Sequence, residues 1–215
     1  MKKLTNYLSE TIRKEKSLII FTILIFIIGL VIGSLFINFI TKEDKTLLIN
    51  QLSLYLTSIK KLSGDVFGIN AFFDNFLNNG LQLTIIFVLG ISMIGVLAVI
   101  LILFFKGFML GTTLSTFILK YQFKGIIGMF LYVFPIMITN ILIYVFLSFF
   151  ATHASIKFLK SLLKKDTLNF KTFLGKYLLS FIISIFFMLL TCLLDCYLTP
   201  ILLKLFTYLI WWNGL

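Results

Sequence analysis

Few side chains of this 215-residue sequence could do acid–base, nucleophilic or metal chemistry, and they lie far apart along the chain. Asp195 is the one acid within the predicted membrane spans, and His153 is the one histidine. Cys192 and Cys196 share an apolar run with Asp195, and we interpret them as small hydrophobic residues. Acid–base catalysis and metal binding both need partner groups that this pattern does not supply. We therefore expect no catalytic residue, no metal ligand and no cofactor.

The composition shows what kind of structure must hold these residues. Hydrophobic residues make up 60% and charged residues 13% of the chain, against roughly 45–50% and about 25% in soluble domains. These values exclude a globular enzyme, a disordered chain and a secreted disulfide scaffold. The net charge of +11 comes from lysines between apolar runs, which favours orientation in a membrane over nucleic-acid binding. We predict an all-α integral membrane protein, a bundle of about five transmembrane helices with amphipathic interfacial helices.

Charged and polar breaks divide the chain into predicted spans and connections. The segments are a cytoplasmic segment at 1–16, a first span at 17–40, an extracytoplasmic loop at 41–80, a three-span bundle at 81–150, a basic cytoplasmic loop at 151–176, a fifth span at 177–198 and an extracytoplasmic tail at 199–215. Within the bundle, spans are expected at 81–105, 108–123 and 125–150. Short loops rich in Lys and Arg stay in the cytoplasm. This arrangement places 12 of the 19 cations inside, so we predict a cytoplasmic amino terminus.

Four residues mark predicted turns, kinks or ends of these spans. Lys106 and Gly107 would form the cytoplasmic turn of a helical hairpin, with Lys106 as an anchor whose stem reaches the interface. Pro135 would kink the span that contains it, and Pro200 would end the fifth span.

Asp195 is the most informative single residue, because a charge deep in a span costs roughly 2.5–3.5 kcal/mol and usually faces a partner or water. We interpret it as a polar clasp to a neighbouring helix, such as one carrying Thr112, Thr116 or Asn140. A role in ion or proton movement is the alternative.

Two pairs of glycines have the spacing that lets membrane helices approach closely. Gly29 and Gly33 form one pair, and Gly107 and Gly111 form the other. We expect these pairs to pack helices of this bundle together, with dimer formation as the alternative.

The extracytoplasmic loop carries apolar residues at helical spacing, namely Leu48, Leu52, Tyr55 and Ile59. The pattern predicts an amphipathic helix outside the membrane. Its apolar face would either dock a partner's transmembrane or juxtamembrane segment or pack back on the bundle. On the cytoplasmic side, the lysines around Ile156 and Leu159 suit contact with membrane lipids.

The order of these features resembles the stage II sporulation protein M family of endospore-forming bacteria. The residues that carry the resemblance are Gly29 and Gly33, Leu89-Gly90-Ile91-Ser92-Met93-Ile94-Gly95, Phe105-Lys106-Gly107-Phe108 with Gly111, Val133-Phe134-Pro135, and Asp195-Cys196-Tyr197-Leu198-Thr199-Pro200. Asp195 stands where the family commonly has Glu, and Ile136 and Met137 stand where polar residues often follow the proline.

The resemblance implies a non-enzymatic membrane scaffold for engulfment during sporulation. It would recruit the peptidoglycan hydrolases called stage II sporulation proteins P and D at the septum, on the mother-cell side. One rival is a small permease or transporter subunit that uses Asp195 and a polar cluster at residues 112–116. Another is a structural bundle that organises the septal membrane without a protein partner. We expect no nucleic acid and no small-molecule substrate.

Overall fold

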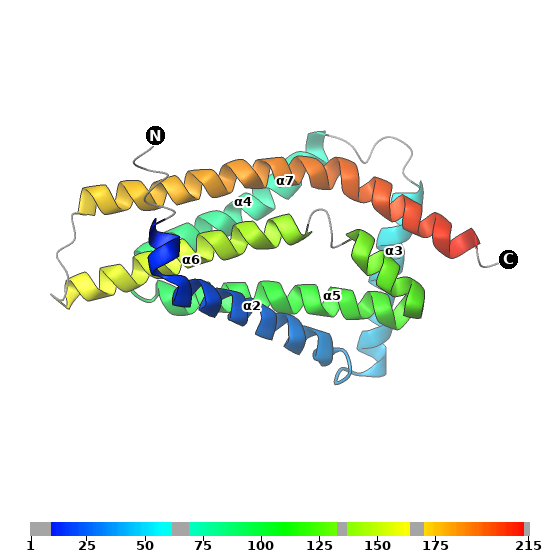
Figure 1. The fold of residues 1–215 in the computed structure, drawn as a ribbon. Coiled ribbons are helices and arrows are strands. Elements are labelled where there is room, and N and C mark those ends of the chain that lie inside the picture. The colour runs from blue at the N-terminus through cyan, green and yellow to red at the C-terminus, as the bar shows by residue number, and fades with distance from the viewer. Residues whose placement is uncertain (1–9, 62–68, 133–136, 164–169, 213–215) are drawn as a thin grey trace.

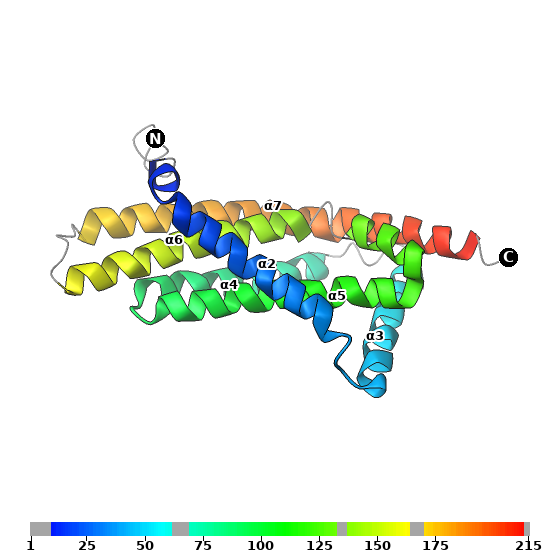
Figure 2. The same cartoon turned by 60° about the horizontal axis from the view of Figure 1, so that its bottom comes forward.

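The computed structural model describes residues 10–61, 69–132, 137–163 and 170–212, and these form helices without strands. The helices are α2 (Lys16–Phe36), α3 (Lys42–Lys61), α4 (Ile69–Ile91), α5 (Gly95–Tyr132), α6 (Ile138–Leu162) and α7 (Phe170–Trp212). Helices α4, α5, α6 and α7 run side by side along the long axis of the molecule, and α2 crosses α5 obliquely (Figures 1 and 2). Helix α3 stands across the end of the bundle at which α2 finishes (Figure 1).

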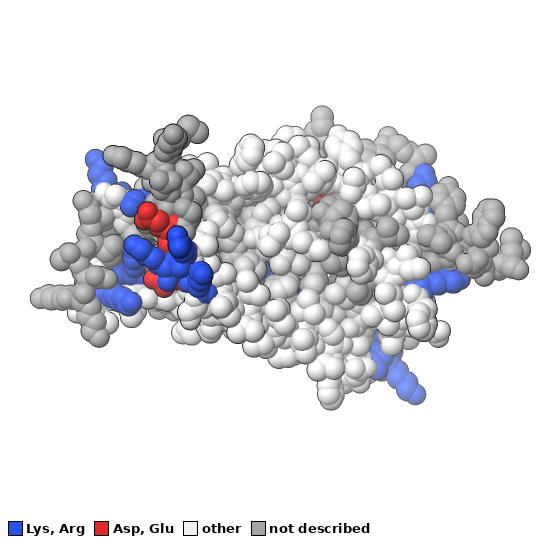
Figure 3. All heavy atoms as spheres, viewed as in Figure 1, with Lys and Arg blue, Asp and Glu red and all other residues white. Residues whose placement is uncertain are grey.

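The surface of this bundle is that of a multi-pass membrane protein. Among the described residues, four helical stretches are long and apolar enough to cross a membrane, at Lys16–Phe36, Gly95–Gly128, Ile138–Leu162 and Lys171–Phe206. Helix α4 lies in the same bundle but has a more polar first half, with Asp74, Asn75 and Asn79. In Figure 3 Lys and Arg lie at both ends of the molecule, with Asp and Glu beside them at one end, and the surface between the two ends is almost wholly uncharged. The all-α membrane fold predicted from the sequence is therefore confirmed.

The hairpin turn predicted at Lys106 and Gly107 is wrong. Helix α5 runs through both residues, and the reversal lies at Ser92–Ile94, between α4 and α5. Gly95 closes this turn, because an added Cβ would overlap the Leu89 carbonyl and the Gly95 N–H donates to the Ser92 carbonyl. The Ser155 hydroxyl of α6 donates to the same Ser92 carbonyl. The real turn contains no charged residue that would mark it in the sequence. Lys106 does carry a charge, but it lies in the middle of a helix, so it indicated a turn that does not exist.

The predicted span at 125–150 is broken in the structure. Gln122 has a positive φ of 49°, and the chain turns back on itself there. The turn is tight, since a Cβ on Gly125 would overlap the Phe117 carbonyl one turn before the break. The returning residues end at Tyr132 and α6 starts at Ile138 (Figure 1). Pro135, the predicted kink, lies outside the described residues.

Two further boundaries differ from those predicted. Helix α6 continues to Leu162, so Ala151, Thr152 and Ser155 are buried in the bundle and do not belong to a cytoplasmic loop. Helix α7 passes through Pro200 to Trp212, although the proline was expected to end it at residue 198. Packing explains the continuation, because Leu203 and Phe206 beyond the proline are buried against α3 and α5.

Helices α2 and α5 pack through the two glycine pairs, as expected for packing within the bundle. A Cβ on Gly29 or Gly33 would overlap the backbone carbonyl of Phe104 or Phe108, and a Cβ on Gly107 would overlap that of Phe26. The Ser115 hydroxyl of α5 also donates to the Ser34 carbonyl at 3.1 Å. These contacts bring the two backbones together and fix the position of α5, which carries Lys106 on another face.

Candidate functional site

The interior of the bundle contains a chain of polar side chains that begins at Asp195 on α7. The Asn75 side-chain amide of α4 donates to one carboxylate oxygen of Asp195 at 2.7 Å, and the Thr199 hydroxyl donates to the other at 2.8 Å. Asp195 is therefore the predicted clasp between helices, with Asn75 as its partner. Of the partners suggested from the sequence, Thr116 bonds to its own helix, and the buried Asn140 Oδ1 has no partner among the described residues.

The polar chain continues from α4 to α6. The Asn79 amide donates to Asn75 Oδ1 at 2.6 Å, and the Tyr144 hydroxyl lies 3.1 Å from Asn79 Oδ1 and 2.9 Å from Gln82 Oε1. Asn75, Asn79 and Gln82 lie on one face of α4, because residues three and four apart on a helix are neighbours. Three helices of the bundle, α4, α6 and α7, are thus joined by hydrogen bonds between side chains that are mostly half-buried.

Lys106 extends this polar region to α5. Its Nζ lies over the Tyr144 ring, 4.3 Å from the centroid, which is the geometry of a cation–π contact. The side chain is half-buried, and no carboxylate of the described residues lies within 4.0 Å of its Nζ. Lys106 is therefore a half-buried lysine in the middle of α5, and the expectation of an anchor at a cytoplasmic turn is wrong. Gly107, next to it, faces α2.

The apolar face predicted for docking belongs to α3 and mainly packs back on the bundle. The Thr41 hydroxyl accepts from the Asp44 N–H and caps the start of this helix. Leu52 and Leu56 are buried in a cluster with Phe117, Leu203 and Phe206. Leu48 is half-buried and Tyr55 is 45% exposed, while the side chain of Ile59 lies outside the described part of the structure. The exposed leucines of α3 are instead Leu47 and Leu54, at 59% and 70%.

The polar cluster at residues 112–116 does not form a separate polar site. The hydroxyls of Thr112 and Thr113 donate to the Met109 carbonyl, and that of Thr116 donates to the Thr112 carbonyl. Ser115 bonds to α2, as described above. These hydroxyls satisfy helix backbone groups, although all three threonines line a cleft of about 210 Å³ between α3 and α5.

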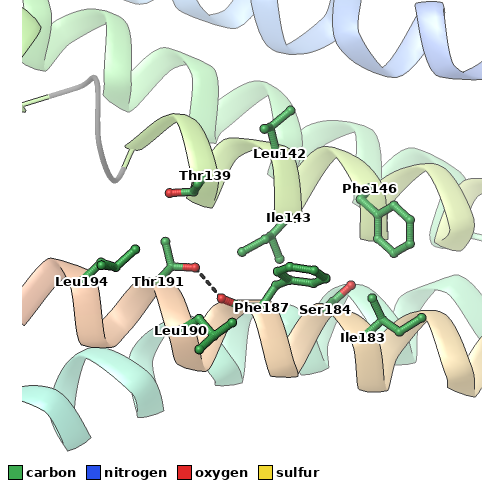
Figure 4. Close-up of a pocket in the computed structure, with 10 residues that line it drawn as sticks. All are labelled: Thr139, Leu142, Ile143, Phe146, Ile183, Ser184, Phe187, Leu190, Thr191 and Leu194. Carbon is green, nitrogen blue, oxygen red and sulfur yellow. Dashed lines mark hydrogen bonds between the residues drawn. The ribbon is translucent and has the colours of Figure 1, made fainter.

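A larger cleft, of about 440 Å³, lies between α6 and α7 and is almost wholly apolar. Figure 4 shows its lining residues, which are Thr139, Leu142, Ile143, Phe146, Ile183, Ser184, Phe187, Leu190, Thr191 and Leu194. The hydroxyls of Ser184 and Thr191 donate to carbonyls of their own helix. The cleft therefore offers shape and apolar surface but no reactive group.

In the part of the chain that the structure describes, the remaining titratable groups do not converge on a reaction centre. His153 Nδ1 lies 4.0 Å from Glu15 Oε1 at the end of the bundle near the start of α2, far along the chain from Asp195. Within the described ranges, no three His, Cys, Asp or Glu residues form a group that could hold a metal ion. Cys192 and Cys196 are buried free thiols.

Comparison with known families assigns this membrane bundle. A family described as SpoIIM, stage II sporulation protein M, matches residues 22–200. The chain belongs to the stage II sporulation protein M family. The matched range includes the α2–α5 glycine contact, Lys106 and the whole polar chain from Asn75 to Asp195. Membership makes this chain a sporulation-related membrane protein. No curated protein and no solved structure matches it.

Sequence reasoning found Asp195 and Lys106 but missed the residues that connect them. Asn75 and Asn79 were predicted to lie in the outer loop at 41–80, and Gln82 was predicted to lie in the span at 81–105. Their spacing at i, i+4 and i+7 on a helix was the available signal, because it places three amides on one face. Tyr144 gave no signal of its own, because tyrosine is also common in apolar helices near interfaces.

Proposed function

We propose that this chain is a non-enzymatic membrane scaffold for engulfment during endospore formation, which recruits and anchors stage II sporulation proteins P and D at the septal membrane. The family match over residues 22–200 carries the proposal. It fits a structure in which the side chains from Asp195 to Tyr144 bond to each other and no three His, Cys, Asp or Glu of the described residues form a group that could hold a metal ion. We further propose that the protein lies in the membrane on the mother-cell side of the septum, with its amino terminus in the cytoplasm. This orientation places α3 outside the cytoplasm, where peptidoglycan lies.

The exposed side of α3 is the docking surface that we propose for the hydrolases. Leu47 and Leu54 are seven residues apart, so they lie on the same side of the helix, and Leu52 and Leu56 on the other side hold α3 against the bundle. A helix that is fixed on one side and carries two exposed leucines on the other suits helix-in-groove packing with a partner segment.

The test is co-purification from sporulating cells that carry an affinity-tagged full chain. Replacing Leu47 and Leu54 together with Ser should abolish recovery of the two hydrolases and stop membrane migration in dye-stained cells. Leu97 and Leu101 of α5 are similarly exposed, at 66% and 56%, and the same replacement there is the matched control. Recovery of the hydrolases with the α3 variant would contradict docking at this surface. Failure to recover them with the unaltered chain would contradict the proposed partners.

A transporter subunit is the second candidate, and the polar chain from Asp195 to Tyr144 with Lys106 beside it is the observation that favours it. Polar groups in membrane interiors often mark ion or proton paths. Proteoliposomes with the purified chain should then show ion or solute flux that falls on Asp195→Asn. Equal flux in vesicles with and without the purified chain would count against this candidate.

A further inference from the structure

A groove between α4 and α5 opens on the outside of the bundle beside Lys106. Its volume is about 330 Å³. Its lining residues are Gln82, Ile85, Ile102, Phe105, Lys106 and Met109. Phe105 and Met109 are more than half exposed, so the rim faces the membrane environment. Whatever fills the groove meets one cation and one amide among apolar side chains.

The cation in this groove has no carboxylate partner of its own among the described residues. Its contact is with the face of the Tyr144 ring, which supplies a weak electrostatic attraction and no countercharge. Asp195, the acid of the polar chain, already accepts hydrogen bonds from Asn75 and Thr199 on its two oxygens. Charged side chains inside membranes usually pair with an opposite charge or face water. A carboxylate brought by another molecule would complete the site.

The depth of Lys106 indicates which molecule could bring that carboxylate. At about 1.5 Å per residue, Lys106 lies about 16 Å along α5 from Gly95 and about 22 Å from Tyr121. The hydrocarbon core of a bilayer is about 30 Å thick. Lys106 is therefore near the middle of the span, away from the lipid phosphates of both leaflets. A transmembrane helix is the structure that carries a polar side chain to this depth, since its backbone groups are satisfied internally.

We propose that the groove between α4 and α5 receives a transmembrane helix of a partner protein that carries an Asp or Glu near its middle, and that Lys106 pairs with this carboxylate. The exposed walls at Ile85, Phe105 and Met109 pack the partner helix, and the charge pair fixes its depth and identity. Gln82 donates a second hydrogen bond to the same carboxylate. The inference deepens the proposed scaffold role, because it states what kind of segment the scaffold holds inside the membrane.

The test uses synthetic transmembrane peptides of leucine with one central Glu, Gln or Leu, and the full-length chain in phosphatidylcholine vesicles. Energy transfer between labelled peptide and labelled protein measures binding. The Glu peptide should bind about tenfold more tightly than the Leu peptide. Lys106→Gln should remove this preference, and Lys106→Arg should keep it. Lys124→Gln, which removes an exposed cation beyond the Gln122 turn, is the matched control and should change nothing.

A charge exchange makes the test independent of general damage to the fold. Lys106→Glu should bind a peptide with a central Lys and reject the Glu peptide. Equal binding of the Glu and Leu peptides by the unaltered chain, or an unchanged preference in Lys106→Gln, would overturn the proposal. Displacement of the Glu peptide by phosphatidylglycerol from the unaltered chain, but not from Lys106→Gln, would also overturn the proposal. Lys106 would then bind a lipid phosphate.

These outcomes separate the groove from the scaffold role. If the hydrolases co-purify but the peptides are not discriminated, the groove fails and the scaffold remains. If the Glu peptide binds through Lys106 but neither hydrolase is recovered, the groove stands and the proposed partners fail.

Discussion

Asp195 shows how a single charged residue is kept inside this bundle. Its carboxylate is stabilised by two donors, one from its own helix and one from α4, so it holds the two helices together as well as being solvated by them. Hydrogen bonds to charged groups are stronger than neutral ones in general, but pairs measured in membrane proteins average about 0.6 kcal/mol and reach about 1.7 kcal/mol. The clasp therefore contributes only modestly to stability, but it holds α7 specifically against α4.

Replacing Asp195 or Asn75 with Ala should lower the free energy of unfolding in mixed micelles, and the double variant should cost less than the sum. The expected coupling is about 0.6–1.7 kcal/mol, because each single change leaves its partner unsatisfied. Asp195→Asn should cost less than Asp195→Ala, since an amide oxygen still accepts from Asn75. Full additivity of the Ala changes would show that the two side chains do not interact.

At the scale of the helix, the α2–α5 contact depends on backbones that touch. An Ala at Gly29 adds a methyl group where the Phe104 carbonyl already lies, so α2 must move. Gly29→Ala should destabilise the protein by about 1–3 kcal/mol, as for other overpacked sites. Gly80→Ala is the control, because a Cβ there meets nothing within 4 Å in the middle of α4 and should stabilise the helix by up to about 1 kcal/mol. Thermal unfolding in detergent separates them, and equal effects would contradict the close contact.

Helix α3 contains a second contrast, between Leu56 and Leu54 two residues apart. Leu56 is 4% exposed and packs on Phe117 and Phe206, whereas Leu54 projects outward. Leu56→Ala should cost about 2–5 kcal/mol of stability, and Leu54→Ala should change it by less than about 0.5 kcal/mol. Under the proposed function, Leu54→Ala weakens hydrolase recovery although the fold is intact. Urea titration in micelles with parallel co-purification measures both, and a stable Leu56→Ala variant would contradict the packing of α3.

Particular elements show what the sequence predicts and what it leaves out. The glycine pairs and the amphipathic helix now seen as α3 were predicted, because each depends on residues close together along the chain. The hairpin turn, the continuation past Pro200 and the polar face of α4 were missed, because each depends on a neighbouring helix. Ser155 bonds to the turn at Ser92, and α3 and α5 pack on α7 beyond Pro200. A single lysine or proline suggests a helix end in the sequence, because the sequence does not show the neighbouring helix that lets the helix continue through it.

For the whole molecule, the arrangement of the helices places Met93, Lys160 and Lys176 at one end and Leu47, Lys120 and Lys204 at the other. Ser155 bonding to Ser92 and Tyr177 bonding to the Phe87 carbonyl fix the first end. Lys120 bonding to Ser53 and Phe206 packing on Phe117 fix the second. The basic residues near the start of α2 and the end of α6 lie at the first end, so the rule for Lys and Arg predicts that this end faces the cytoplasm, as proposed above.

Single-cysteine labelling tests this arrangement in a chain whose Cys192 and Cys196 are replaced by Ala. A membrane-impermeant maleimide added to spheroplasts should label Leu47→Cys, and should label Met93→Cys and Lys160→Cys only after the membrane is opened. Met109→Cys should stay unlabelled in both conditions, because the structure places it on the membrane face of α5, three residues beyond Lys106. A turn at Lys106 predicts the reverse result for Met93 and Met109. Met109→Cys would then be labelled after the membrane is opened, and Met93→Cys would be protected within a span. The comparison of Met93 with Met109 therefore decides between the two hairpins, and labelling of Leu47→Cys decides which end faces the peptidoglycan.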